Sequence, residues 1–449
     1  MFRDLTRYEA YEVAGDWVSE VPRGWGWEPA RTIFAERKVT GFIDEQMLSV
    51  TIGRGVLPQA DLIASTSKKD SSNIDKSKYK LVEPGDIVYN KMRAWQGAAG
   101  MSQHRGIVSP AYIVMTPRSV RPEYLHHVVR TPMFAKEAER WSYGITSDQW
   151  SLRPEHFKMI RFPVPPPEEQ AAIVKYLAHA NARINKAIAT KRRLISLLEE
   201  QKIAEVNSVI EVDWPRVPIK RALRSMTAGA WGSAPDESND PARWCVRVAD
   251  FDYPSGGVAD SPKTYRAIAD REFSKRSLRR GDLLLEGSGG GEKTPVGRVV
   301  LFNHNDDALC SNFLQRLRPS DNVVPEFLSL MLRRVHASGE VRRYIKQTTG
   351  IQNLDLGAYM THEIPMPSIR EQQRAVSNID AVFRGIDVVA VRVKQEIALL
   401  REFRTRLVAD VVTGQVDVRA IAATLPDASE EDVPLLDEEL VDAVEGDDE

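Results

Sequence analysis

The chain has 449 residues, of which 42% are hydrophobic and 28% are charged, so it is long enough to form two or three globular cores. No apolar run approaches the roughly 18 residues of a transmembrane helix, and the N-terminus has no basic segment followed by an apolar one. Neither membrane anchoring nor export is therefore indicated, and we expect a cytoplasmic protein. Cys245, Cys310 and eight scattered histidines show no metal-ligand spacing, so we expect neither a disulfide framework nor a zinc site.

The net charge of −2 conceals an asymmetry along the chain. From Ala420 to Glu449 there are twelve Asp or Glu and no Lys or Arg, so the other 419 residues carry 61 basic and 51 acidic groups. A basic body permits nucleic-acid binding without proving it. We expect residues 420–449 to be an acidic, disordered tail, because they combine high charge density with a lack of aromatic residues.

Residues 1–161 carry short strand, turn and helix signals. The segment YKLVEPGDIVYNKMRAWQGAAG predicts a tight turn at Gly85 and Asp86, a buried strand and a Gly-rich loop. GIVSPAYIVMTPR then predicts a turn and a strand, and RPEYLHHVVRTPMFAKEAER predicts a helix. A polar loop, YGITSDQWSLRPEHF, leads out of this first globular half.

Residues 162–210 are predicted to form one long helix. Its start, FPVPPPEEQ, combines prolines, which lose no hydrogen bond in a first turn, with carboxylates that face the positive end of the helix dipole. Apolar residues then recur at alternating steps of four and three from Ile173 to Leu198, interrupted by Lys191, which is the narrow seam of a coiled coil. About 40 residues at 1.5 Å each make a rod of roughly 60 Å.

The second half of the chain repeats this order. Residues 211–363 form the second predicted globular half, in which RSLRRGDLLLEGSGGG matches the earlier turn, strand and Gly-rich loop. Residues 364–413 form the second long helix, with Glu169 falling on Glu371 and Gln170 on Gln372 at a constant offset of 202 residues. Its predicted seam runs Ile379, Val382, Ile386, Val389, Val393, Ile397, Leu400 and Phe403.

The duplicated pattern predicts an α/β (α+β) fold. Two similar domains would be separated by two long helices that form an antiparallel coiled coil with pseudo-twofold symmetry. Two similar but unequal heads suit a ligand with two similar but unequal half-sites. A lone heptad seam has a plainer interpretation as an oligomerisation helix, but here each copy closes one globular half.

Motifs for catalysis are weak. The loop GSGGGEKT has the Lys-Thr of a phosphate-binding loop, but Glu292 stands where the second glycine belongs and would repel a phosphate. The chain has no [ND]PP[YF] tetrapeptide or FxGxG loop of an adenine methyltransferase, and no convincing Ser-His-Asp or paired-carboxylate pattern. We therefore expect a protein that is not an enzyme and that binds no cofactor.

The two helix starts, VPPPEEQAAI and MPSIREQQRAV, together with PGDIVYNKMRAWQGAAG and GIVSPAY, resemble the DNA-specificity subunits of type I restriction-modification enzymes over nearly the whole chain. The second start lacks the proline triplet, and the acidic tail is an addition. The resemblance implies two target-recognition domains that read a bipartite double-stranded DNA sequence. It also implies docking of two adenine-methylating modification subunits, which would hold S-adenosylmethionine, and of nuclease-translocase subunits in the full complex.

DNA reading needs planar hydrogen-bonding side chains for base edges, with cations and hydroxyls for phosphates. In the first half the loops supply Asn90, Lys91, Arg93, Trp95, Gln96, Thr146, Ser147, Gln149 and Arg153. In the second half they supply Ser288, Lys293, Arg298, Gln347, Thr348, Thr349, Gln352 and Asn353. The alternative for each is an ordinary solvated loop residue, and for Trp95 it is packing beneath its neighbouring glycines.

Docking of the modification subunits is predicted on the outward faces of the long helices, at Lys191, Arg192, Arg193, Arg401, Arg404 and Arg406. The alternative is a helix surface that only confers solubility. Two other classes of protein stay open: a coiled-coil scaffold without specific DNA binding, and a self-contained DNA-modifying enzyme.

Overall fold

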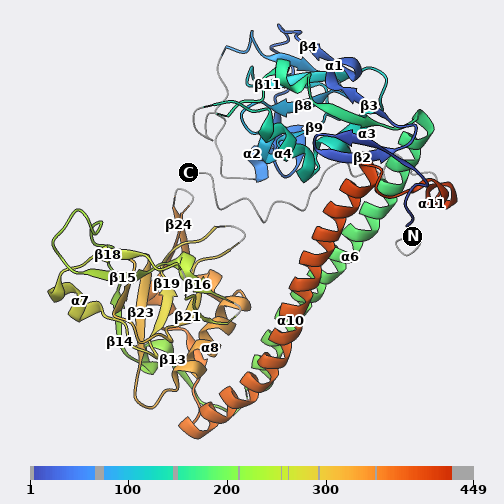
Figure 1. The fold of residues 1–449 in the computed structure, drawn as a ribbon. Coiled ribbons are helices and arrows are strands. Elements are labelled where there is room, and N and C mark those ends of the chain that lie inside the picture. The colour runs from blue at the N-terminus through green and yellow to red at the C-terminus, as the bar shows by residue number, and fades with distance from the viewer. Residues whose placement is uncertain are drawn as a thin grey trace. The chain divides into compact units, whose positions relative to one another are not determined.

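The computed structural model describes residues 5–65, 75–144, 150–210, 213–253, 255–260, 262–291, 294–348 and 351–426 (Figure 1). The chain divides into two compact units. Unit 1 comprises Met1–Lys191 and Glu396–Glu449, and unit 2 comprises Arg192–Gln395. Of the helices within the described ranges, none is long and apolar enough to cross a lipid bilayer.

The globular part of unit 1 contains these elements in chain order: β1 (Tyr11–Gly15), β2 (Val18–Pro22), β3 (Gly26–Pro29), α1 (Ala30–Ile33), β4 (Phe34–Arg37), β5 (Leu48–Thr51), β6 (Gly55–Pro58), α2 (Gln59–Ser65), β7 (Lys80–Val82), β8 (Ile87–Asn90), η1 (Ala94–Gln96), β9 (Ala99–Met101), β10 (Gly106–Val108), β11 (Tyr112–Pro117), α3 (Pro122–Val129), α4 (Pro132–Arg140), α5 (Pro154–Phe157) and β12 (Arg161–Val164).

The globular part of unit 2 contains β13 (Arg216–Pro218), η3 (Ile219–Ala222), β14 (Leu223–Ala228), β15 (Ala242–Val246), η4 (Val248–Asp250), β16 (Phe251–Asp252), β17 (Gly257–Val258), β18 (Tyr265–Ala267), α7 (Asp270–Arg276), β19 (Leu283–Glu286), β20 (Ser288–Gly289), β21 (Val299–Leu301), β22 (Ala308–Cys310), β23 (Leu314–Pro319), α8 (Pro325–Ala337), η5 (Glu340–Tyr344), β24 (Ile345–Thr348), β25 (Ile351–Leu354), α9 (Leu356–Tyr359) and β26 (Glu363–Pro365). The long helices are α6 (Pro167–Ser208) and α10 (Ile369–Val412), and α11 (Arg419–Thr424) follows.

Each unit is built around the same four-stranded sheet. The strand order is β4-β11-β8-β9 in unit 1 and β14-β23-β19-β21 in unit 2, and every pairing is antiparallel. The central strands are apolar and buried, with IVYN in β8 and LLLE in β19. A helix, α3 or α8, follows the β11 or β23 strand in each case. The sequence therefore correctly predicted two related α/β units.

The turn before each central strand is built alike. Gly85 and Gly281 adopt φ of 91° and 93°, a left-handed conformation that glycine takes without a Cβ clash. The next residue, Asp86 or Asp282, is 2% exposed, and its carboxylate accepts a hydrogen bond from a backbone N–H three residues earlier, at 2.9 or 2.8 Å. Each carboxylate also receives two hydrogen bonds from one arginine. These buried ion pairs fix where the central strand begins.

The prolines before each long helix lie partly in a strand, which differs from the prediction. β12 pairs with β3 and β26 pairs with β13, so the helices begin only at Pro167 and Ile369. Proline is tolerated in such two-stranded edges because its missing N–H costs no ladder hydrogen bond there. The 202-residue offset survives at atomic detail, since the Gln170 and Gln372 side chains each donate to the carbonyl five residues earlier.

The long helices α6 and α10 lie side by side and antiparallel within each unit (Figure 1). In unit 1, Asn185 accepts from Arg404 at 3.0 Å and Lys191 pairs with Glu396 at 2.5 Å. In unit 2, Lys202 pairs with Asp387 at 2.5 Å. Ile188 of α6 and Val393 and Ile397 of α10 are buried between these contacts, whereas Leu194, which the predicted seam of α6 includes, is 39% exposed.

Part of the buried seam of α10 lies one residue later in the sequence than predicted. Val382, Val389 and Phe403 are 38%, 43% and 39% exposed, whereas Ala390 and Arg404 are 7% exposed. Buried residues follow the steps of three and four through Ile386, Ala390, Val393 and Ile397 to Arg404. The sequence misled because adjacent apolar residues in a helix offer two seams about 100° apart.

The end of α10 is fastened to α3 and to residues that flank the N-terminal β1–β2 hairpin of unit 1. Tyr124 Oη donates to the Val412 carbonyl at 2.8 Å, and Thr6 bridges to Asp417. At the start of α6, the Glu169 carboxylate is 7% exposed and accepts from Tyr8 Oη at 2.5 Å and from Trp25 Nε1 at 3.0 Å. The acidic tail was predicted to begin at Ala420, but Arg419–Thr424 form α11 and residues 427–449 lie outside the described ranges.

Candidate nucleic-acid interface

In unit 1 the predicted loop after β8 is tightly folded. Asn90 Oδ1 accepts a hydrogen bond from Met92 N at 3.0 Å, and Trp95 Nε1 donates to the Met92 carbonyl at 3.0 Å. The 3₁₀ turn η1 contains Trp95 and Gln96. Arg93 and Gln96 are exposed, while Asn90, Lys91 and Trp95 are half-buried. The loop thus presents a guanidinium and an amide from a fixed backbone.

The segment before the first long helix meets this loop. Leu152 N donates to the Lys91 carbonyl at 2.8 Å, and the Trp95 and Trp150 rings lie edge to face, with centroids 5.4 Å apart. Arg153 is exposed at the start of α5. The structure therefore brings together two groups that are about 60 residues apart in the sequence. Thr146, Ser147 and Gln149 lie outside the described residues.

In unit 2 most of the predicted residues lie on one small sheet, ordered β20-β25-β24. Ser288 pairs with Asn353 in register, and its hydroxyl donates to Asn353 Oδ1 at 2.7 Å. Gln347 and Thr348 belong to β24, and Gln347 and Asn353 are exposed. Lys293 and Thr349 lie outside the described residues. The loop after the central strand and the segment before the long helix meet here too.

Two predicted residues of unit 2 turn inward. Arg298 donates to both oxygens of Glu286 at 2.8 and 3.0 Å, and its guanidinium lies 4.6 Å from the centre of the Tyr253 ring. Gln352 is 5% exposed and accepts from Val296 N at 3.1 Å. Alternation along β25 buries Gln352 and exposes Asn353. Both residues hold the loop in place from beneath.

Exposed aromatic residues next to this sheet were missed from the sequence. Phe313 and Trp231 are 51% and 37% exposed, and both line a hollow of about 300 Å³ with Arg247 and Asn312. The Phe313 carbonyl accepts from Ser288 N at 3.3 Å, so this hollow adjoins β20. Single aromatics outside a strand pattern give no periodic signal, but an aromatic in a polar loop such as CSNF is a usable clue.

The residues predicted for partner docking do not share one outward face. Arg404 is buried in the α6–α10 seam, and Lys191 is half-buried in its pair with Glu396, which corrects their predicted orientation. Arg192 and Arg401 are half-buried. Only Arg193 and Arg406 of the six stand outward, with side chains 65% and 82% exposed. Arg404 is buried because the seam of α10 is shifted by one residue from its predicted position.

The described residues do not contain a group of three or more His, Cys, Asp and Glu side chains arranged to hold a metal ion. Cys245 and Cys310 are buried and free, and burial raises the pKa of both thiols to about 12. A thiol with such a pKa is a poor nucleophile at neutral pH. These two cysteines pack in the β15–β22 pair and serve the core.

The fold and site define a class of protein with two related α/β units, in which two polar segments meet within each unit and each unit includes part of the long helices α6 and α10. No protein-family model matches the chain. It is similar to the EcoKI specificity subunit of a type I restriction enzyme from Escherichia coli (strain K12), with 19% identity over 432 residues, 89% of this chain and 90% of the relative. The StySPI specificity subunit from Salmonella potsdam is also 19% identical, over 433 residues, 88% of this chain and 90% of the relative.

A solved structure shares the fold. It comes from work on complex assembly and conformational transition of the type I R-M system. It aligns with this chain with a TM-score of 0.61 at 16% identity, over 88% of this chain and 99% of the solved chain. The resemblance to type I specificity subunits that the sequence predicted is therefore confirmed over nearly the whole length.

Proposed function

We propose that this chain is the DNA-specificity subunit of a type I restriction-modification complex. The observation that carries the proposal is the similarity to two specificity subunits over 88–89% of this chain, together with a duplicated unit in which two polar segments meet. Each unit would read one half of a bipartite target. Because the two units differ in their loops, the two half-sites would differ, and the target would be asymmetric.

Base reading is assigned to the exposed planar side chains. In unit 1 these are Arg93, Gln96 and Arg153, and in unit 2 they are Gln347 and Asn353. Amides and guanidiniums form paired hydrogen bonds with base edges in the major groove. Arg298 and Gln352 would act indirectly, by fixing the loop that carries Ser288.

Catalysis is assigned to other subunits. Modification subunits that bind S-adenosylmethionine would methylate adenine within each half-site, and nuclease-translocase subunits would join the full complex. The outward Arg193 and Arg406 support a docking role for the long helices. A scaffold without DNA specificity would not need the two exposed polar sets.

The length of α6 and α10 is proposed to set the spacing of the half-sites. Inserting one heptad into each helix keeps the seam and adds about 10 Å, close to three base-pair rises. The recognised spacer should lengthen while each half-site stays the same.

The proposal is tested by deleting the gene and mapping adenine methylation across the host genome. One bipartite motif should disappear and return on complementation. An unchanged methylation map, with the modification subunits still expressed, would contradict the proposal. Purified chain with S-adenosylmethionine, Mg²⁺ and DNA should show no methylation or cleavage, which separates it from a self-contained enzyme.

A further inference from the structure

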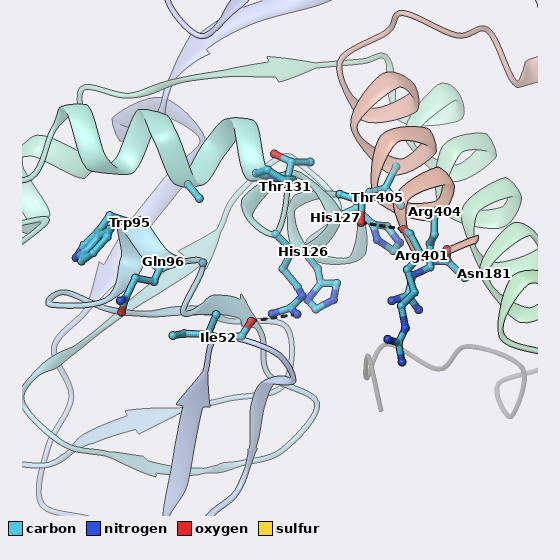
Figure 2. A pocket seen from close by; sticks show the side chains of 15 residues that line it. Ile52, Trp95, Gln96, His126, His127, Thr131, Asn181, Arg401, Arg404 and Thr405 are labelled. Atoms are coloured by element: carbon cyan, nitrogen blue, oxygen red, sulfur yellow. Dashed lines mark hydrogen bonds between the residues drawn. The ribbon is translucent and has the colours of Figure 1, made fainter. Parts of the chain in front are cut away.

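Unit 1 contains a cationic hollow of about 360 Å³ (Figure 2). On one side lie Trp95 and Gln96 of η1, with His126, His127 and Thr131 from α3 and the turn after it. On the other lie Asn181 of α6 and Arg401, Arg404 and Thr405 of α10. Its lining, all within the described residues, includes three arginines and two histidines and no Asp or Glu.

Arg401 is the side chain that most needs a ligand in this hollow. It is half-buried, and its Nε is a buried donor with no acceptor among the described residues. A buried donor without an acceptor costs free energy that an anion would recover. Arg404 is fixed beside it by its hydrogen bond to Asn185.

The equivalent hollow in unit 2 provides an internal comparison. At the 202-residue offset, Glu199 replaces Arg401 and Lys202 replaces Arg404. Lys202 is neutralised by Asp387 at 2.5 Å and by Glu199 at 3.8 Å. The lining of the unit 2 hollow therefore contains one acid, Glu199, among its cations, and Asp387 lies against Lys202 from outside that lining, whereas the lining of the unit 1 hollow contains no acid.

The chain supplies a matching anion close to this hollow. Residues 427–449 contain twelve Asp or Glu and no Lys or Arg. The described chain ends at Pro426, whose carbonyl accepts from His179 Nε2 at 2.9 Å. His179 and Asn181 are two residues apart on α6, which separates them by about 3 Å along the helix axis and by about 200° around it, so the segment after Pro426 would pass around α6 to reach the hollow. An extended segment of 23 residues reaches about 75 Å, so its reach does not limit docking.

We propose that the acidic segment 427–449 docks in this hollow, with its carboxylates against Arg401 and Arg404. Charge complementarity and the position of Pro426 favour this occupant. Trp95 and Gln96 line the same hollow and belong to the DNA-reading loop, so the docked segment would compete with DNA. The competition between the acidic segment and DNA rests on the proposed function, whereas docking of the segment in the hollow does not depend on it.

Docking is tested with a labelled peptide of residues 427–449 and a chain that ends at Pro426, by fluorescence anisotropy at low and high salt. The peptide should bind and weaken steeply with salt. R401Q should weaken binding at least tenfold, R401K should retain most of it, and R406Q on the exposed face should match the parent chain. Unfolding midpoints show whether each variant is folded. No peptide binding, or equal binding to R401Q and R406Q, would overturn the proposal.

Competition is tested by DNA titration of the complex assembled with either full-length or truncated chain. Truncation should raise DNA affinity several-fold, and added peptide should reverse the gain. If R401Q weakens DNA binding by the truncated complex while the peptide does not bind, the hollow holds a DNA phosphate and the proposal fails. If the peptide binds as expected but neither complex binds DNA, docking stands and the proposed function fails.

Discussion

Glu169→Ala should destabilise unit 1, and Glu371→Ala, at the equivalent position of the repeat, should have a far smaller effect. Glu169 is buried and is the acceptor for two buried donors, Tyr8 Oη and Trp25 Nε1. Glu371 is exposed and accepts from the backbone and hydroxyl of Ser368 at the helix start. The same helix position therefore has two different roles.

The magnitude follows from the donors left without an acceptor. Each buried unsatisfied donor costs about 1–3 kcal/mol, so losing the carboxylate and leaving two donors unpaired should cost about 2–6 kcal/mol, with the lower part of this range applying if water enters. The contact from Arg419 at 3.6 Å adds little, because that side chain is 56% exposed. Glu169→Gln keeps an acceptor and should fall between wild type and Glu169→Ala.

Hydrogen exchange followed by mass spectrometry is the suitable assay, because two units need not unfold in one transition. Peptides that cover β1, β2 and the end of α10 should exchange about 30-fold or more faster in Glu169→Ala, since 1.4 kcal/mol corresponds to a factor of ten. Peptides of unit 2 should be unchanged. Equal, small effects of Glu169→Ala and Glu371→Ala would refute the assignment of Glu169 as the acceptor that fastens the hairpin.

Three further predictions concern unit 2. Gly281→Ala should lower the stability of unit 2 by about 1–2 kcal/mol, because φ at this position is 93°. Gly385→Ala in α10 should raise it by about 0.5–1 kcal/mol, because a Cβ there meets open space and alanine favours the helix. Denaturant midpoints measure both changes, and changes of the same sign would contradict the account. Burial lowers the pKa of His336 below its ordinary value of 6.5, so the folded state favours the neutral imidazole. The stability of unit 2 is therefore highest above pH 6.5 and falls as the pH drops toward the folded-state pKa. The melting temperature of His336→Gln should accordingly decrease less than that of wild type between about pH 7.5 and pH 5. Asn353→Ala or Gln347→Ala should weaken discrimination at one half-site by about 1–3 kcal/mol per lost base contact in a binding assay with single-base variants, with the other half-site unaffected.

The features that could be predicted from the sequence are those with a local or repeated signal. The long helices follow from heptad spacing, and the turns at Gly85 and Gly281 follow from turn chemistry before an apolar strand. The 202-residue repeat made the two units visible, because both copies carry the same signals at the same spacing. The sequence named residues in the loop after the central strand and in the segment before the long helix, but their contact through Leu152 N and the Lys91 carbonyl came only from the structure.

The remaining features depend on register and on long-range packing. Whether Gln352 or Asn353 faces outward is decided by strand register, since a shift of one residue exchanges the two faces. The seam of α10 was misjudged because Val389 and Ala390 are both apolar, and only packing against α6 decides which is buried. Phe313 and Trp231 escaped notice because their proximity comes from distant segments.

The central claim is that each unit reads one half of a bipartite DNA target. The most direct measurement exchanges residues 1–161 for those of another type I specificity subunit and maps methylated adenines in cells that express the modification subunits. One half-site should change to that of the donor, and the other half-site and the spacer should stay as they were. A map in which both half-sites change together, or neither changes, would contradict the claim.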